Sequence, residues 1–248
     1  MENRLFLLSV KELGEEPSES ELWQQVYERL DEGRLTKVTS LRNSRKRAES
    51  AGGGLLVQHL LHQVFCEENE QRERFVSEAG KPVAFALERY TLSELLSKPG
   101  VPIPVRYTYG TKGKPYLQAR ENLPEMFFNL SHSGDYVICA VSEREVGADI
   151  QKMQMQGTER LANRFFSEEE RKLLQSCDSS EHRLEIFYRL WTRKEAYGKL
   201  TGEGITASID KDFSDLTADW MRSLIWEEFD ELSGYKIACC ARRQDNGM

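Results

Sequence analysis

The first apolar segment of the chain, Leu5 to Val10 (LFLLSV), is continuous enough to predict a buried strand. An acidic stretch from Glu15 to Glu21 follows it and leads into a segment where Leu22, Val26 and Leu30 recur at helical spacing. The pattern of hydrophobic and polar positions therefore predicts a strand and then an amphipathic helix.

The same order of elements recurs later in the chain. Val146 to Ile150 alternates as a strand, and a polar connection leads to a helical stretch from Ala162 to Gln175. Within that stretch Ser167 is a good N-cap, and three acids after it complement the helix dipole. The recurrence is one of element order and not of sequence. It predicts an α+β fold of two related halves that meet near Glu143 to Glu145, an N-terminal lobe over residues 1–143 and a C-terminal lobe over residues 144–248.

The middle of the chain is less regular. Leu55 to Phe65 is apolar enough for a buried helix, and Gly52 to Gly54 before it is expected to mark the helix start or a bend, because each glycine costs a helix about 1 kcal/mol. The charged segment from Glu67 to Lys98 is interpreted as a surface insertion. Further strands are expected at Phe128 to Leu130, Tyr136 to Val141 and Lys236 to Ala241.

Composition narrows the class of protein. With 39% hydrophobic and 30% charged residues among 248, the chain can bury a substantial core. No apolar run approaches the ~20 residues of a membrane span, and the first residues do not resemble a secretory signal, so we expect a cytoplasmic protein without membrane association. A net charge of −7 argues against general nucleic-acid binding, although Arg42 to Arg47 is a local basic patch. The five cysteines lack a C-x-x-C pair and are expected to be small buried hydrophobes.

The strand VGADIQ, from Val146 to Gln151, carries the first candidate for chemistry. Its alternation places Gly147, Asp149 and Gln151 on one face, so that a carboxylate lies beside an amide at a strand end. Asp149 is therefore a candidate metal ligand. The next residue on the same face of the strand, Gln151, carries an amide in place of an acid.

A second candidate lies in FYRLWTRKEAYGKLTGEGI, from Phe187 to Ile205. On a helix Trp191, Glu195 and Lys199 fall at i, i+4 and i+8 and share one face. One interpretation is a solvated Glu-to-Lys pair, which is common on helices. Against it, the segment is aromatic for an exposed face, and Gly198 is a costly choice unless another group approaches closely.

Two loops could hold phosphate. In NLSHSGDYVICAV a Ser-His-Ser-Gly turn opens a strand, and Ser131 and His132 could grip an oxyanion or a phosphate, or His132 could only cap the turn. A protease-like site is disfavoured, because these neighbours point to opposite sides of a strand. TYGTKGKPYL is either a plain hairpin turn or a rigid loop that presents Lys114 to a phosphate.

The order of these motifs matters more than any one of them. GKP, then N-x-SHSG, then VGADI, then LW-x-x-KEA-x-x-K resembles the 4′-phosphopantetheinyl transferases of the larger, two-lobed type that activate peptide and polyketide synthases. The resemblance runs from about Arg34 to Ile205, and the last two motifs are the specific ones. It implies a pseudo-twofold α+β fold, a pair of similar lobes with coenzyme A between them and Mg²⁺ on its pyrophosphate. It also implies transfer of the phosphopantetheine arm to a serine of an apo acyl or peptidyl carrier protein. Adenosine 3′,5′-bisphosphate would be released, and the enzyme would be a monomer.

The resemblance also implies roles for individual residues. Asp149 and Glu195 match Mg²⁺ ligands, and Lys199 matches a lysine that helps to deprotonate the carrier serine or stabilises the leaving phosphate. Glu195, Lys199 and His132 are thus the implied catalytic residues. The implied coenzyme A contacts are Lys114, Pro115, Ser131, His132 and Lys194, with Arg34 and Lys37 near the 3′-phosphate.

Two departures from the family pattern affect these expectations. Gln151 stands where many relatives have a second acid; an amide oxygen can still ligate a hard cation or hold a ligating water, so we expect retained activity with weaker metal binding. Glu49 stands where relatives often have a basic residue near the nucleotide. Two other functions stay open, namely a non-catalytic module that binds carrier proteins and a Mg²⁺-dependent phosphohydrolase with water as nucleophile.

Overall fold

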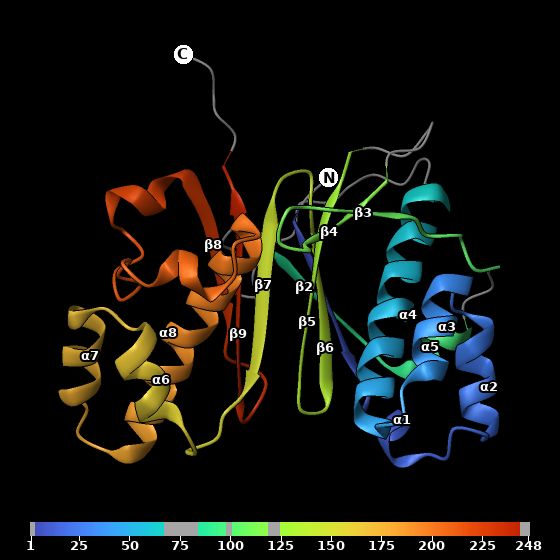
Figure 1. The fold of residues 1–248 in the computed structure, drawn as a ribbon, viewed down its shortest axis with the longest axis horizontal. Coiled ribbons are helices and arrows are strands. Elements are labelled where there is room, and N and C mark those ends of the chain that lie inside the picture. Colours follow the sequence, from blue (N-terminus) through green and yellow to red (C-terminus); the bar gives the residue numbers. More distant parts are fainter. Residues whose placement is uncertain (1–2, 67–83, 98–100, 119–124, 244–248) are drawn as a thin grey trace.

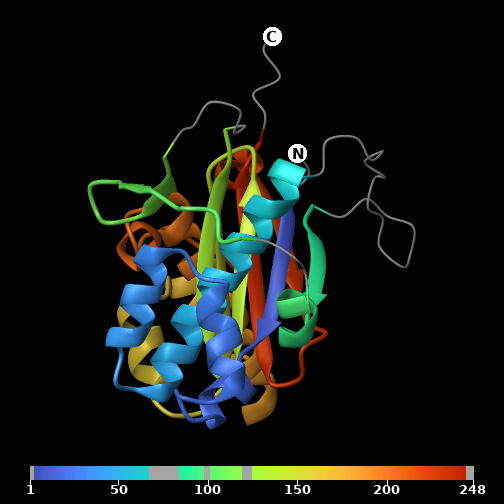
Figure 2. The ribbon, with the colours of Figure 1, turned by 90° about the vertical axis from the view of Figure 1, so that its right-hand side faces the viewer.

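The computed structural model describes residues 3–66, 84–97, 101–118 and 125–243. Two sheets stack face to face at the centre, and helices cover the outer face of each (Figure 1). Figure 2, turned by 90°, shows the N-terminal helices lying across the sheet behind them. The layers are therefore helix, sheet, sheet and helix, an α+β architecture as predicted.

The N-terminal half contains the sheet with strand order β2-β1-β6-β5. Its longest helix, α4, packs against β1 and β6. The elements are β1 (Arg4–Ser9), α1 (Lys11–Glu15), α2 (Glu21–Glu28), α3 (Glu32–Ser40), α4 (Ser44–Cys66), β2 (Ala86–Tyr90), α5 (Leu92–Ser97), a separate hairpin of β3 (Tyr107–Tyr109) and β4 (Pro115–Leu117), β5 (Phe127–Ser133) and β6 (Tyr136–Ser142).

The C-terminal half contains the sheet with strand order β7-β9-β8. Its longest helix, α8, packs against β7 and β9. The elements are β7 (Val146–Lys152), α6 (Thr158–Phe165), α7 (Glu168–Gln175), α8 (Ser180–Thr201), the short 3-10 helices η1 (Ile205–Ser208) and η2 (Asp219–Ser223), β8 (Leu224–Phe229) and β9 (Tyr235–Arg242).

The two halves repeat one pairing scheme. In each, the first strand pairs antiparallel with the last strand, which pairs antiparallel with the strand before it: β1-β6-β5 in one half and β7-β9-β8 in the other. The predicted boundary at residue 143 falls in the short link between β6 and β7. Because both sheets contribute to one shared core, the division into two lobes stays a proposal.

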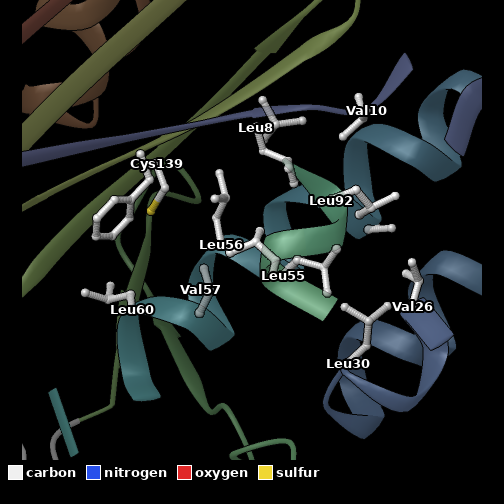
Figure 3. Close-up of a cluster of buried hydrophobic side chains, with 14 of the residues drawn as sticks. Leu8, Val10, Val26, Leu30, Leu55, Leu56, Val57, Leu60, Leu92 and Cys139 are labelled. Atoms are coloured by element: carbon white, nitrogen blue, oxygen red, sulfur yellow. The ribbon is translucent and has the colours of Figure 1, made fainter. Parts of the chain in front are cut away.

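Strand β1 explains how the core is built. Leu5 and Leu7 face the other sheet, where they pack with residues such as Ile150, whereas Phe6 and Leu8 face the helical layer. A strand that is buried on both faces has no polar side to show, and this accounts for the unbroken apolar run in the sequence. Figure 3 shows Leu8 and Cys139 among the leucines and valines of α4 and α2.

The glycine triplet in α4 has a different role from the predicted one. The helix runs without interruption from Ser44 to Cys66, so Gly52 to Gly54 do not mark its start. A Cβ at Gly52 would lie 2.5 Å from Val10 Cγ1, and one at Gly54 would lie 2.7 Å from Arg34 Cγ. The glycines instead let the helix lie close to the sheet on one side and to α3 on another, which offsets their low helix propensity.

The helical stretch predicted from Ala162 to Gln175 is two helices. Ser167 has extended backbone angles and accepts a hydrogen bond from the Glu170 amide, while the Glu170 carboxylate accepts one from the Ser167 amide. This capping box starts α7 and so ends α6, as the predicted N-cap requires. The prediction of Ser167 as an N-cap is confirmed, and the prediction of one helix is wrong.

The predicted surface insertion is also wrong in its last part. Ala86–Tyr90 pairs parallel with β1, and Leu92 and Leu95 of α5 are buried, so this part belongs to the sheet and the core. The charged pattern hid it because β2 is an edge strand whose outer face is polar. Residues 67–83 lie outside the described ranges.

Two expectations from composition can also be compared with the structure. Cys139, Cys177, Cys239 and Cys240 are buried and unpaired, as predicted for small hydrophobes. Among the described residues, none of the helices combines the length and the apolar character that a membrane crossing requires.

Candidate active site

Strands β5 and β7 lie side by side where the two sheets meet (Figure 1). No backbone ladder joins them; alternate side chains of β5 instead accept hydrogen bonds from alternate backbone amides of β7. These bonds run from Ala148 N to Asn129 Oδ1 (3.1 Å), from Ile150 N to Ser131 Oγ (3.4 Å) and from Lys152 N to Ser133 Oγ (3.0 Å).

Asp149 lies at the centre of this junction and is 1% exposed. Its Oδ1 accepts a hydrogen bond of 2.8 Å from Ser131 Oγ and lies 2.6 Å from the Lys199 ammonium. Its Oδ2 accepts a hydrogen bond of 2.9 Å from Gln151 Nε2. Both carboxylate oxygens of Asp149 therefore accept hydrogen bonds from the protein itself. Gln151 supplies a hydrogen-bond donor at a position where an acid would supply a second negative charge.

The close approach of α8 to β7 depends on Gly147. A Cβ at this position would lie 2.0 Å from the Ala196 carbonyl oxygen and 2.5 Å from the Leu200 amide nitrogen, both of which belong to the helix backbone. Without a side chain here, α8 rests directly on the strand, and the Lys199 ammonium reaches Asp149 and the Ala148 carbonyl oxygen, at 3.2 Å. Gly198 has a related function on the other side of the helix, because a Cβ there would lie 2.5 Å from Gly204.

Glu195 lies one helical turn before Lys199 and is partly buried. Burial and, next, the negative charge of Asp149 raise the pKa of Glu195 to about 7, against the opposing charge of Lys199. Its carboxylate makes no hydrogen bond or ion pair with the described residues. A carboxylate that is disfavoured in its charged form and has no donor can be stabilised by a cation.

The donor set fits a hard divalent cation. Among the described residues, no three or more His, Cys, Asp or Glu side chains gather as a metal site, and the acids that lie near each other here are Asp149 and Glu195. Mg²⁺ usually takes one or two carboxylates and completes its shell with water and substrate phosphates. The Oε1 atom of Gln151 has no hydrogen-bond partner in the described part of the chain, and it could serve as a third oxygen ligand or hold a water.

Ser131 and His132 point to opposite sides of β5, as predicted. Ser131 is 5% exposed and faces Asp149, whereas the His132 side chain is 55% exposed and its Nδ1 lies 3.2 Å from Glu49 Oε2. Glu49, which departs from the family pattern, thus pairs with the neighbouring histidine of the SHSG motif. A phosphate contact of His132 stays a prediction.

The predicted hairpin around GKP is present, and the Lys114 ammonium is bound within the protein. Its side chain is 6% exposed, and its ammonium donates to the carbonyl oxygens of Leu200 (2.8 Å) and Val146 (3.3 Å) and pairs with Glu145. Pro115 follows as the first residue of β4. In this structure Lys114 therefore joins the hairpin to the end of α8 and the start of β7, a structural role that the sequence did not predict.

Lys194 lies in the protein interior. It is fully buried, and its ammonium lies 3.0 Å from Glu170 Oε2 and donates to the carbonyl oxygens of Ser208 and Lys211, both at 2.9 Å. Burial lowers the pKa of Lys194, and the negative charge of Glu170 opposes that shift. Five positions before Lys199, it lies on a different face of the helix, and its contact with a phosphate stays a prediction.

Arg34 and Lys37 lie on α3, in the outer helical layer. The stem of Arg34 packs against Gly54 of α4, and Lys37 is exposed. In the ranges that the structure describes, no hydrogen bond or ion pair connects them to Asp149 or Lys199. The structure therefore does not bring them together with the acids, and their contact with a 3′-phosphate stays a prediction.

Comparison with known proteins identifies the family. The sequence profile of the 4′-phosphopantetheinyl transferase superfamily matches residues 145–240. A 4′-phosphopantetheinyl transferase of Bacillus subtilis is 35% identical over 153 residues, which cover 57% of this chain and 66% of that protein. The 4′-phosphopantetheinyl transferase psf-1 of Bacillus pumilus is 32% identical over 183 residues, which cover 70% of this chain and 76% of that protein. The chain belongs to the 4′-phosphopantetheinyl transferase superfamily. The resemblance inferred from the motifs is thereby confirmed.

The family profile matches the C-terminal half, and one relative has a higher identity over a shorter aligned length. The 4′-phosphopantetheinyl transferase HetI of a Nostoc species is 43% identical over 103 residues, which cover 41% of this chain and 43% of that protein. The chain spans 66%, 59% and 65% of the length of three curated relatives that it matches. The matched profile contains the family segment that holds Asp149, Glu195 and Lys199.

Two residues that organise the site were not recognised from the sequence. Gly147 carried a signal, because an isolated glycine inside a strand pattern often marks the close approach of another backbone. The sequence contained no signal for Glu170 beyond its place in the first turn of a helix, where acids are common. Its role depends on Lys194, which is distant in the sequence.

Proposed function

We propose that this protein transfers the 4′-phosphopantetheine arm of coenzyme A to a serine of an apo acyl or peptidyl carrier protein, in a Mg²⁺-dependent reaction that releases adenosine 3′,5′-bisphosphate. The observation that carries the proposal is the convergence of Asp149, Glu195 and Lys199 within the segment that matches the family profile. A monomer in the cytoplasm is part of the proposal.

Asp149 and Glu195 would hold the Mg²⁺ ion, with Gln151 as a ligand or as the holder of a ligating water. When bound, the cation would neutralise charge on the pyrophosphate as the leaving group departs. Support comes from Glu195, because burial and, next, repulsion by the charge of Asp149 raise the pKa of this carboxyl to about 7 in the metal-free protein. A cation between them relieves that repulsion.

In the reaction, the carrier serine oxygen forms a bond to the phosphorus that bears the pantetheine arm. The bond from that phosphorus to the oxygen of adenosine 3′,5′-bisphosphate breaks, and the serine proton must be accepted by a base. Lys199 is an ammonium ion paired with Asp149 at 2.6 Å, which supports a role in stabilising phosphate charge over one as a base. Glu195, bound to the cation as proposed, would not accept that proton, because a bound divalent cation lowers the proton affinity of its carboxylate ligand.

Contacts to the nucleotide end of coenzyme A are proposed for His132, Arg34 and Lys37. The exposure of His132 and Lys37 supports this, since a side chain must be accessible to meet a phosphate. Lys114 and Lys194 are left out, because their ammonium groups are bound within the protein.

The proposal is tested by incubating the purified protein with an apo carrier protein, coenzyme A and Mg²⁺, and measuring the intact mass of the carrier. The expected product carries one phosphopantetheine adduct, which is absent from a carrier whose acceptor serine is replaced by alanine. Asp149→Ala and Glu195→Ala should each abolish the adduct and leave the circular dichroism spectrum unchanged. Carrier binding without an adduct across several carriers would favour the binding module, and phosphate release without a carrier would favour the phosphohydrolase.

A further inference from the structure

The side chains of β5 that face β7 differ in what else they touch. Asn129, Ser131 and Ser133 each accept a hydrogen bond from a backbone amide of β7. Ser131 is the one whose hydroxyl also contacts the charged groups of the candidate site, Asp149 and Lys199. We infer that Ser131 is a positioning residue that sets the geometry of the Asp149 carboxylate and the Lys199 ammonium; this inference rests on the proposed function.

The hydrogen-bonding capacity of the Ser131 hydroxyl is fully used inside the protein. It donates to Asp149 Oδ1 at 2.8 Å and accepts from Lys199 Nζ at 2.7 Å and from the Ile150 amide at 3.4 Å. A hydroxyl offers one donor and two acceptor lone pairs, so none remains for a ligand. The residue is also 5% exposed. In this structure Ser131 is therefore a supporting group of the site.

The same hydroxyl connects three elements. It belongs to β5 of the N-terminal half, and its partners belong to β7 and α8 of the C-terminal half. Strand side chains alternate between faces, so a slip of one residue between β5 and β7 would turn Ser131 away from Asp149. The relative position of β5 and β7 therefore affects the geometry of Asp149 and Lys199 through this side chain.

Removal of the hydroxyl should leave the fold and loosen the site. Asp149 would lose one of its donors and Lys199 one of its acceptors in a buried position, which allows both side chains to leave their arrangement. Ser133→Ala is the matched control, because it deletes the same type of hydroxyl and the same type of amide bond, two residues along the strand and away from Asp149.

The experiment compares wild type, Ser131→Ala and Ser133→Ala in the carrier-modification assay and by nuclear magnetic resonance. Amide hydrogen exchange should accelerate at Ile150 in the first variant and at Lys152 in the second, which verifies each local deletion. In Ser131→Ala we expect kcat to fall about tenfold or more with the KM for coenzyme A changed less than about twofold, whereas Ser133→Ala stays within about twofold of wild type. The ¹⁵N relaxation of the Lys199 ammonium should report greater mobility in Ser131→Ala alone.

Three outcomes would overturn the inference: a higher KM for coenzyme A with unchanged kcat, which indicates a direct ligand contact; equal losses of kcat in both variants; or equal Lys199 mobility in both. If Ser131→Ala does not fold, Ser131→Cys preserves a weak donor and acceptor of similar shape and should show a smaller loss of kcat with the same unchanged KM. If wild type forms no adduct, the proposed function fails, and the Lys199 relaxation alone decides whether Ser131 holds that side chain.

Discussion

The Lys199 ammonium lies 2.6 Å from Asp149 Oδ1, so an ion pair joins the end of helix α8 to the middle of strand β7. Asp149 is nearly fully buried and Lys199 partly so, which makes the pair more sensitive to geometry than an exposed one. The contact exists because the helix backbone lies directly on the strand at Gly147. Packing of backbone on backbone thus determines the electrostatics of the site.

Gly147→Ala tests this dependence on packing. The new Cβ would lie 2.0 Å from the Ala196 carbonyl oxygen, and since that atom belongs to backbone the helix must shift. We expect a loss of about 3 kcal/mol in the free energy of unfolding and a loss of transfer activity. The measurement is urea denaturation with the adduct assay. Gly14→Ala is the control: no atom lies within 4 Å of a Cβ there, and in a helix it should be neutral or stabilising by up to about 1 kcal/mol. Equal stability of the two variants would refute the packing argument.

Glu195→Gln tests the electrostatics of the metal-free site. The pKa of Glu195 is raised to about 7 in the folded protein, above its ordinary 4.5, so the stability linked to its proton is fully present below about pH 4.5 and is lost as the pH rises through about 7. With a chelator present, wild type should lose up to about 2 kcal/mol between pH 5 and pH 8 that the variant does not lose. Chemical denaturation at several pH values measures the difference. Parallel pH profiles would show that Glu195 titrates normally.

Gln151→Glu tests the amide beside Asp149. The change removes the donor that lies 2.9 Å from Asp149 Oδ2 and adds a negative charge. Without a cation the variant should melt at a lower temperature than wild type, and with Mg²⁺ it should gain more stability, because the site then offers three charged oxygen ligands. Thermal unfolding over a Mg²⁺ titration measures both effects.

The matched control for that titration is Gln156→Glu, which adds the same charge at an exposed position after β7. It should follow wild type at every Mg²⁺ concentration. An unchanged Mg²⁺ requirement in Gln151→Glu would show that this position does not contribute to cation binding.

Lys194→Met separates a structural role from a ligand role for this lysine. The change leaves the Glu170 carboxylate fully buried without the ammonium that lies 3.0 Å away. We expect a loss of about 3–5 kcal/mol in the free energy of unfolding, because an uncompensated buried charge is costly. Lys172→Met, at an exposed lysine paired with Glu168, is the control and should change stability little. A stable Lys194→Met variant with weaker coenzyme A binding would restore the phosphate contact that the motif implied.

Much of the fold was predictable because the local pattern of hydrophobic and polar residues indicates which positions are buried. Alternation and apolar runs predicted β1, β5, β6, β7 and β9, and the order of motifs predicted the family. The predictions failed where a local signal had a distant cause: the glycines of α4 accommodate Val10 and Arg34, and the polar strand β2 is held by pairing with β1. Propensity describes a segment alone, whereas these segments are stabilised by tertiary packing.

Lys114, Lys194 and Lys199 show what the sequence determines by itself and what the tertiary structure determines. The sequence by itself determined which motif each belongs to and which face of its element it occupies, because helix and strand periods fix side-chain direction. The tertiary structure decided their partners: Glu145 and the end of α8 for Lys114, Glu170 for Lys194, and Asp149 with Ser131 for Lys199. The physical reason is that an ammonium group is bound by whichever oxygens the fold brings near it, and spacing along the chain does not contain those distances.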